Sequence, residues 1–260
     1  MLYHEISGNG KKPLVLLHGF MENTTIWEEM EAHLSKDFTL IKIDLPGHGK
    51  SKVYQEIHTV ELMAEKVKEV IDALKLEKIN LLGHSLGGYV SLAFAEKFPE
   101  ILESMTLFFS TTLADDDEKK QIRKRSIAVI DENFETFVKT SIPNLFSNNE
   151  KDILEGKIEL AKNIAKSTNK EGVKAAQLGM AERPDRTEIL ENLDAKILII
   201  AGKYDKAVKT ENLLKIIPEK TNIKTYVLDC GHNGHWEKPT ICAEIINTEL
   251  LHNLPKHFLL

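Results

Sequence analysis

Cysteine is scarce in this chain, and so are several features that mark whole classes of protein. Its two cysteines, Cys230 and Cys242, are too few for a disulfide framework, so we expect reduced thiols and a cytoplasmic location. No apolar stretch approaches the roughly 18 residues that a membrane-spanning helix needs. The first residues, 1–6, read as an alternating strand without the apolar segment of a signal peptide. We therefore expect no membrane partner.

An excess of positive charge is also absent. The formal net charge is −6 and the sequence pI is about 6.0, which argues against a nucleic-acid partner. The basic run at 119–125 follows the acidic residues 115–118, a pattern typical of a solvated helix with acidic residues in its first turn. With 42% hydrophobic and 28% charged residues, 260 residues can form one globular domain with an insertion. The sequence leaves the oligomeric state undetermined.

What the chain does have is a regular alternation of apolar strands and amphipathic helices. Strands are expected at residues 1–6, 14–17, 38–43, 79–82, 105–109, 197–200 and 224–228. Helices are expected at 25–34, 59–74, after Ser85, and at 209–217 and 240–251. This alternation predicts an α/β fold with a mostly parallel central sheet and helices on both of its faces.

The alternation is interrupted by a charged helical stretch rich in Lys, Glu and Asn. We predict core segments at 1–110 and 191–260, with a helical cap at 111–190 inserted after the sixth core strand. An insertion on such a loop lies over the carboxyl edge of the sheet, where α/β folds bind ligands. The cap residues Phe137 and Phe146 are therefore predicted to line a substrate pocket. The alternatives are that both pack the cap interior, or that the insertion has no role in the pocket.

The segment Gly83-His84-Ser85-Leu86-Gly87 lies between an apolar strand and a predicted helix. Glycines two positions before and after Ser85 remove the side chains that would clash in a sharp turn from strand to helix. Such a turn lifts the serine hydroxyl above the sheet and exposes it as a nucleophile. The alternative is a serine that caps a helix beside a packing glycine.

A second motif, His18-Gly19-Phe20, follows the strand at 14–17. Attack on an ester carbonyl builds negative charge on its oxygen, and each backbone N–H aimed at that oxygen lowers the barrier by roughly 3 kcal/mol. We expect the amides of Phe20 and Leu86 to form this oxyanion hole. Both His18 and Gly19 are placed at the substrate pocket, with His18 bracing the loop rather than acting as a base.

A serine nucleophile needs a base, and the base needs an orienting carboxylate. Asp205 follows the strand at 197–200, and His232 follows the strand at 224–228. Parallel strands bring both to the sheet edge that carries Ser85, in the chain order Ser, Asp, His. The rival carboxylates are those of Asp194, Asp229 and residues 115–117.

His235 is the rival base, because it lies in the same short segment as His232. Gly231 permits a tight backbone path into His232, whereas Gly234 begins a second bend. We expect that bend to turn His235 away from Ser85 and toward Trp236 or the rim of the pocket.

These motifs, together with Asp-Leu-Pro-Gly-His-Gly-Lys-Ser at 44–51 and Gly-Lys-Tyr-Asp at 202–205, resemble those of the α/β-hydrolase superfamily. The chain looks like its small, capped, serine-dependent esterase and lactone-hydrolase branch, over residues 1–109 and 196–254. The resemblance implies a triad of Ser85, Asp205 and His232. A serine at position 85 speaks against haloalkane dehalogenases and epoxide hydrolases, which use an aspartate. Leu86 replaces the methionine common in cofactor-free haloperoxidases and many C–C bond hydrolases.

We therefore predict a carboxylic-ester hydrolase that forms an acyl-enzyme with small to medium substrates and uses neither metal nor organic cofactor. The expected partner is a small-molecule ester or lactone. The alternatives are a lactone or C–C bond hydrolase with the same triad, and a ligand sensor that turns over slowly. Arg183 and Arg186 either meet an acidic substrate or form structural ion pairs with Asp185 or Glu188.

Overall fold

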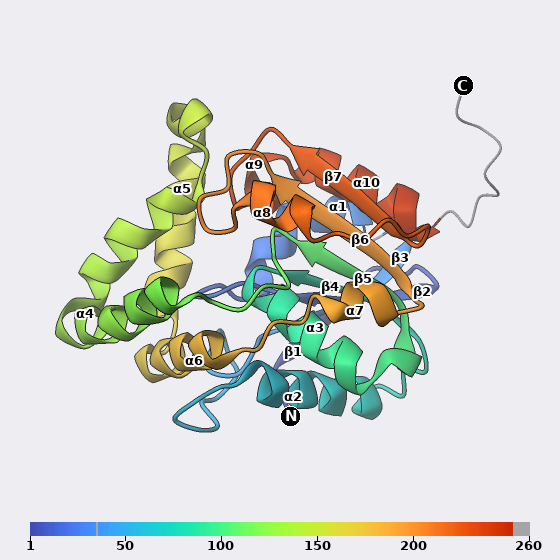
Figure 1. The fold of residues 1–260 in the computed structure, drawn as a ribbon, viewed down its shortest axis with the longest axis horizontal. Helices are drawn as coiled ribbons and strands as arrows, with labels where there is room; N and C mark the ends of the chain where they lie inside the picture. Colours follow the sequence, from blue (N-terminus) through green and yellow to red (C-terminus); the bar gives the residue numbers. More distant parts are fainter. Residues whose placement is uncertain (35, 252–260) are drawn as a thin grey trace.

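A seven-stranded sheet runs through the middle of the part of the chain that the computed structural model describes, residues 1–34 and 36–251 (Figure 1). Along the sheet the strands lie in the order β1-β3-β2-β4-β5-β6-β7, with β1 antiparallel to β3 and the other neighbours parallel. The strands are β1 His4–Ser7, β2 Lys12–Leu17, β3 Phe38–Ile43, β4 Ile79–His84, β5 Leu102–Phe108, β6 Lys196–Gly202 and β7 Ile223–Leu228. The predicted mostly parallel sheet is confirmed.

The central strands are buried along most of their length because helices cover both faces of the sheet. Every residue of β4 is buried, whereas the edge strand β7 exposes Lys224, Thr225 and Val227. One face packs against α2 Val60–Ala73, α3 Leu86–Lys97, α7 Glu188–Asn192 and α8 Thr210–Lys215. The other packs against η1 Thr24–Trp27, α1 Glu28–Leu34, α9 Gly234–Glu237 and α10 Pro239–Leu251. The short helix η2 Pro99–Ile101 leads into β5.

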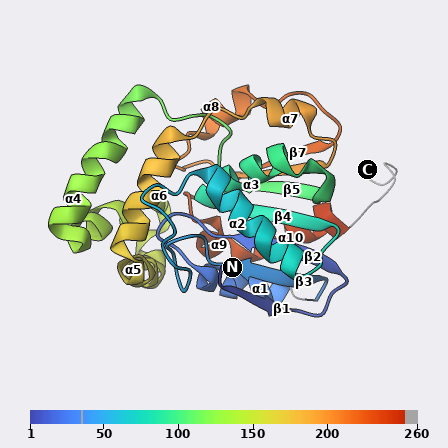
Figure 2. The same cartoon turned by 90° about the horizontal axis from the view of Figure 1, so that it is seen from below.

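The helical insertion forms a separate group beside one end of the sheet (Figures 1 and 2). It consists of α4 Asp117–Ser141, η3 Ile142–Leu145, η4 Asn148–Glu150, α5 Lys151–Ser167 and α6 Lys170–Glu182. The insertion follows β5, so the prediction that it follows a sixth core strand is wrong. The described chain enters the sheet with the single antiparallel strand β1, and only five strands precede the insertion.

The start of α4 agrees with its sequence pattern, but its middle does not. The Asp116 side chain accepts a hydrogen bond from the Lys119 amide at 2.7 Å and caps the helix. Asn133 then interrupts the helix with φ −154° and ψ 88°. Its side-chain oxygen accepts from the Thr136 amide at 2.9 Å and so caps the second half. The sequence pattern did not predict this interruption, because apolar residues continue on both sides of it.

Helix α6 fastens the insertion to the core at the loop after β3. The amide of His58 donates to the carbonyl of Ala175 at 3.0 Å. Gly172 packs so closely on Gly47 that a Cβ at position 172 would lie 2.2 Å from the Gly47 oxygen. The insertion is therefore fastened to the core beyond the carboxyl end of β3. None of the helices in the described ranges is both long and apolar enough to cross a membrane.

Candidate active site

Ser85 occupies the turn between β4 and α3, in a backbone conformation that costs free energy. Its φ is +49° and its ψ is −109°, outside the regions that non-glycine residues prefer. A Cβ at Gly83 would lie 2.2 Å from the backbone of Gly87, and one at Gly87 would lie 2.4 Å from the Leu17 oxygen. Both glycines are therefore required by the turn. The turn leaves Ser85 partly exposed at the carboxyl edge of an otherwise buried strand.

Two backbone amides near Ser85 have no protein acceptor within the described residues. Leu86 is the first residue of α3, and the first amides of a helix lack intrahelical partners. The amide of Phe20, in the loop after β2, likewise donates to no described residue. Both amides thus retain the hydrogen-bonding capacity that an oxyanion hole requires.

His18 joins two loops at the strand ends. Its Nδ1 donates to the Gly19 carbonyl at 2.7 Å, and its Nε2 accepts from the Leu45 amide at 2.9 Å. This arrangement uses a neutral imidazole, and burial lowers the pKa of His18. The ring is fully buried, so His18 shapes the loop that carries Phe20.

Asp205 and His232, predicted from separate segments, form a close buried pair. The Asp205 Oδ2 atom lies 2.7 Å from the His232 Nδ1 atom. The other carboxylate oxygen accepts from the amides of Ala207 and Val208, both at 2.8 Å. These bonds fix the carboxylate in one orientation, and the carboxylate in turn fixes the tautomer and rotation of the His232 ring.

The backbone around His232 is held by the cap and by one buried carboxylate. The His232 amide donates to the carbonyl of Leu145 in the insertion at 2.8 Å. Glu237 accepts from the Gly231 amide at 2.9 Å and from the Asn233 amide at 3.3 Å. The loop that presents His232 is therefore rigid on both sides of the ring.

His84, the residue before Ser85, lies directly against His232. Its Nε2 atom is 3.0 Å from the His232 carbonyl oxygen, and the two ring centroids are 5.1 Å apart. Glu22 completes this contact from the loop after β2, with its Oε2 atom 2.8 Å from the His84 Nδ1 atom. The sequence analysis missed Glu22. The one available signal was an acidic residue placed just after His-Gly-Phe, in a segment that is otherwise apolar or neutral.

The rival residues have other partners. His235 is fully buried between His84 and Trp236, with ring centroids at 4.7 and 4.3 Å, and burial lowers its pKa well below 6.5. Asp194 precedes β6 and so lies at the opposite end of this strand from Asp205. Asp229 is exposed and pairs with Lys203 at 3.2 Å.

Arg183 and Arg186 form structural ion pairs, but their partners differ from Asp185 and Glu188. Arg183 contacts Asp115 at 2.9 Å and lies over the Tyr89 ring, 3.9 Å from its centroid. Arg186 pairs with glutamates of α2 and α3, namely Glu61 at 2.5 Å and Glu96 at 2.9 Å. Both arginines bind acidic groups far away in sequence because they fasten the return of the chain from the cap to the core.

The two cap phenylalanines differ in their surroundings. Phe146 is fully buried and stacks on Trp236, with ring centroids 6.0 Å apart and planes 7° apart. Phe137 is only partly buried at the edge of the apolar cluster that contains Phe146. The contacts of Phe146 tie the cap to the helix that follows His232.

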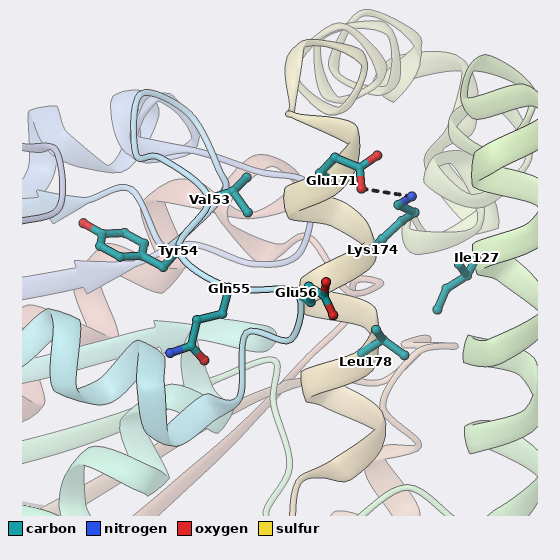
Figure 3. A pocket seen from close by; sticks show the side chains of 8 residues that line it. All are labelled: Val53, Tyr54, Gln55, Glu56, Ile127, Glu171, Lys174 and Leu178. Atoms are coloured by element: carbon teal, nitrogen blue, oxygen red, sulfur yellow. Dashed lines mark ion pairs between the residues drawn. The ribbon is translucent and has the colours of Figure 1, made fainter.

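A hollow of about 540 Å³ lies between the loop at 53–56 and the cap helices α4 and α6 (Figure 3). Its described lining residues include none of the predicted site residues. The cation among them, Lys174, is paired with Glu171 at 3.0 Å and with Asp131 at 2.9 Å. The described lining of the hollow therefore has no unpaired cation that could bind an anionic ligand.

Comparison with known proteins gives consistent results. The sequence model of the alpha/beta hydrolase fold family matches residues 12–239. A thermophilic esterase from Thermogutta terrifontis, with malate bound, is 32% identical with a TM-score of 0.89, over 96% of this chain and 93% of its own. A 2-hydroxy-6-oxononadienedioate/2-hydroxy-6-oxononatrienedioate hydrolase of Escherichia coli K12 is 27% identical, over 88% of this chain and 84% of its own. An enol-lactonase from Burkholderia xenovorans LB400 shares the fold, with a TM-score of 0.89 at 20% identity over 96% of each chain.

Proposed function

The chain belongs to the alpha/beta hydrolase fold family, and from this premise we propose that it hydrolyses carboxylic esters through Ser85, His232 and Asp205. The observation that carries the proposal is the 2.7 Å contact between Asp205 and His232, with His232 bonded through its carbonyl to the neighbour of Ser85. The esterase at 32% identity over nearly the whole chain supports an ester as the substrate.

In the proposed reaction, His232 removes the hydroxyl proton of Ser85 as the serine oxygen attacks the ester carbonyl carbon. Asp205 holds the imidazole with Nε2 toward the serine and stabilises the imidazolium that forms. The amides of Phe20 and Leu86 bind the oxyanion of the tetrahedral intermediate, at roughly 3 kcal/mol for each donor. Collapse of the intermediate breaks the ester bond, and the imidazolium gives its proton to the leaving alcohol.

The second half of the reaction returns the enzyme to its starting state. Water enters, His232 takes one of its protons, and the hydroxide attacks the acyl carbon. The same two amides bind the second oxyanion; the bond between the acyl carbon and Ser85 then breaks, His232 returns its proton to the serine oxygen, and the carboxylic acid leaves. No metal or organic cofactor takes part in these steps.

A fluorophosphonate probe and a p-nitrophenyl ester test this proposal. We expect the probe to label Ser85, and Ser85→Ala to reduce kcat/KM by on the order of 10⁴-fold or more without loss of the fold. Circular dichroism checks the fold of the variant. If Ser85→Ala keeps more than a tenth of the activity, in protein free of contaminating esterase, the serine mechanism is wrong.

Carbon–carbon bond hydrolysis is the second candidate function, favoured by the E. coli relative at 27% identity. The substrate in that relative's name has a carbon chain with a 6-oxo group between two carboxylates and no ester link. Its hydrolysis therefore breaks a carbon–carbon bond. Such a reaction on this chain would use Ser85, His232 and Asp205 to attack the keto carbonyl. Lactones are cyclic esters and fall within the first proposal.

Relative specificity constants separate these functions. A panel of p-nitrophenyl esters, aliphatic lactones and a 2-hydroxy-6-oxodienoate is compared on one enzyme preparation. We expect esters or lactones to give the highest kcat/KM. A dienoate preferred over every ester by more than tenfold would assign the carbon–carbon activity instead. Stoichiometric labelling without turnover of any substrate would indicate a ligand sensor.

A further inference from the structure

Two buried carboxylate–histidine pairs lie side by side at the carboxyl edge of the sheet. In one, Asp205 contacts His232 Nδ1 at 2.7 Å, and in the other, Glu22 contacts His84 Nδ1 at 2.8 Å. The first pair supplies the base of the proposed reaction, while the second is as deeply buried and has no step in it. A buried pair of this kind is costly to desolvate, so its presence beside the site requires a reason.

We propose that Glu22 and His84 are positioning residues that hold the base His232 and the oxyanion loop in one fixed geometry. This inference rests on the proposed function, since it gives the pair a role only in relation to that base. Neither residue touches the reacting atoms in the mechanism above. Their effect is exerted through the backbone on either side of them.

One end of this pair fixes His232. A carbonyl oxygen only accepts hydrogen bonds, so the His84 Nε2 atom, 3.0 Å from the His232 oxygen, must carry a proton. On the other side of the same residue, the carbonyl of Leu145 accepts the His232 amide at 2.8 Å. The backbone of the base is thus bound at both of its polar atoms.

The other end fixes the oxyanion loop. The Oε2 atom of Glu22 accepts the Gly19 amide at 2.6 Å as well as the His84 ring. Gly19 precedes Phe20, whose amide is a proposed oxyanion donor. Two transition-state groups from distant parts of the chain, at positions 20 and 232, are therefore joined through two side chains. A displacement of about 1 Å between such groups can cost on the order of 10²-fold in rate.

The charges around His84 favour a doubly protonated ring. Burial lowers the pKa of His84, but the Glu22 carboxylate outweighs burial and raises it above its usual value. Burial likewise raises the pKa of Glu22, and His84 outweighs it, so that the pKa falls to about 2. The other titratable groups that face this pair are Asp205, His18, His232 and His235. An imidazolium can donate at both nitrogens at once, which is what the two contacts of His84 require.

Two isosteric substitutions of His84 separate its two bonds. In His84→Gln, the side-chain amide reaches the position of Nε2 and retains the bond to the His232 carbonyl. In His84→Asn, the shorter amide reaches the position of Nδ1 and retains the bond to Glu22 instead. Each variant keeps one bond and serves as the matched control for the other.

We expect His84→Gln to lower the ester kcat by about threefold to tenfold because it breaks the link to Glu22, and His84→Asn to lower it by on the order of 30-fold because it frees the backbone of the base, with KM changed less than twofold in both. Thermal stability should follow the opposite order, because both variants remove the cation but only His84→Asn keeps a hydrogen bond to the buried Glu22 carboxylate. Glu31→Gln, which breaks the remote Glu31–Lys42 pair at 2.7 Å, should lower Tm without changing kcat. If activity follows Tm across these variants, the pair is merely structural and the proposal is overturned.

A readout without substrate separates this proposal from the proposed function. In ¹⁵N-histidine-labelled protein, the Nδ1–H proton of His232 bonded to Asp205 gives a downfield NMR resonance. We expect His84→Asn to shift or broaden it, and His84→Gln to leave it in place. An unchanged resonance in His84→Asn overturns the positioning role even if the wild type hydrolyses esters. If His84→Asn shifts the resonance but the wild type hydrolyses no ester, the positioning role is supported and the proposed function is refuted.

Discussion

His232 and His235 are both buried and lie close together in the sequence, but their chemical environments differ. The ring of His232 has a carboxylate on Nδ1, whereas the nitrogens of His235 have no hydrogen-bond partner among the described residues. A carboxylate on one side of an imidazole supports the positive charge that a general base acquires. The Glu22 Oε1 atom lies 3.8 Å from the His235 Nε2 atom, too far for a hydrogen bond, and burial outweighs this charge and lowers the pKa of His235.

At this residue scale we expect His232→Ala to reduce kcat/KM by on the order of 10⁴-fold, as Ser85→Ala does. The double variant should be little worse than either, because groups that act as a unit are not additive. His235→Ala should lower kcat/KM by about tenfold at most. It should also lower the stability of the fold, because removing the buried ring leaves a cavity. Steady-state kinetics on one p-nitrophenyl ester measure all four proteins. If His235→Ala instead loses more activity than His232→Ala, His235 is the base and the assignment of Asp205 as its orienting carboxylate is wrong as well.

At the scale of elements, the helical insertion contacts the framework that holds His232. The last residue of η3, Leu145, accepts the His232 amide, and the next residue, Phe146, stacks on Trp236 in α9. The insertion therefore reaches the loop that presents the base. Changes in this part of the cap are expected to act on stability and on the placement of the base together.

Phe146→Ala should destabilise the fold by about 3 kcal/mol or more, because a large aromatic side chain leaves a buried cavity. The relative preference for ester chain length should stay constant. Phe137→Ala is the matched comparison: its side chain is only partly buried, so the stability loss should be smaller. Urea unfolding and an ester series from acetate to octanoate measure both effects. A changed chain-length profile in Phe146→Ala at unchanged stability would instead place this ring in the pocket.

At the scale of the whole molecule, we expect buried histidines to make the fold sensitive to acid. Burial lowers the pKa of His48 to about 3, and it also lowers the pKa of His18, His58 and His235. The unfolded chain binds protons at these positions near pH 6.5, while the folded chain does not. The stability that these neutral histidines contribute is therefore fully present above pH 6.5. It is lost as the pH falls from 6.5 toward their lower pKa values in the folded state.

Glu22 acts in the same direction at lower pH, and His84 acts in the opposite direction. The depressed pKa of Glu22, about 2, contributes stability above its ordinary pKa that is lost as the pH falls toward 2. The raised pKa of His84 contributes stability below pH 6.5 that is lost as the pH rises through the folded-state value. Because the loss from His84 falls above pH 6.5, the slope below pH 6.5 is set by the four histidines with lowered pKa and by Glu22, and we expect it to be positive.

The free energy of unfolding should therefore rise between pH 4 and pH 6.5, with His48 contributing on the order of a few kcal/mol. His48→Asn, which can keep the bond to the Pro46 carbonyl, should make this dependence shallower. His33→Asn, which removes an exposed histidine instead of a buried one, is the matched control. Guanidinium unfolding at several pH values measures the slopes. Equal slopes in wild type and His48→Asn would show that His48 is not neutral in the folded state.

The sequence by itself determined the alternation of strands and helices, the parallel sheet and the strand-to-helix turn at Ser85. These features depend on neighbouring residues: apolar runs form buried strands, and Gly83 and Gly87 leave room for the turn. The same local signals placed Asp205 and His232 at strand ends, and the fold brings them within 2.7 Å. That these groups carry out ester hydrolysis stays a prediction until the variants are measured.

Only the tertiary structure decided the partners of the buried charged groups. Glu22 and His84 are 62 positions apart in sequence, and His84 and His232 are 148 apart. The partners of Arg186 in α2 and α3, the stacking of Phe146 on Trp236 and the break at Asn133 were also outside any local pattern. A local pattern reports whether a side chain is buried, but not which other buried side chain faces it. For a charged group that partner sets the pKa and the cost of burial, so its role follows from the packed fold.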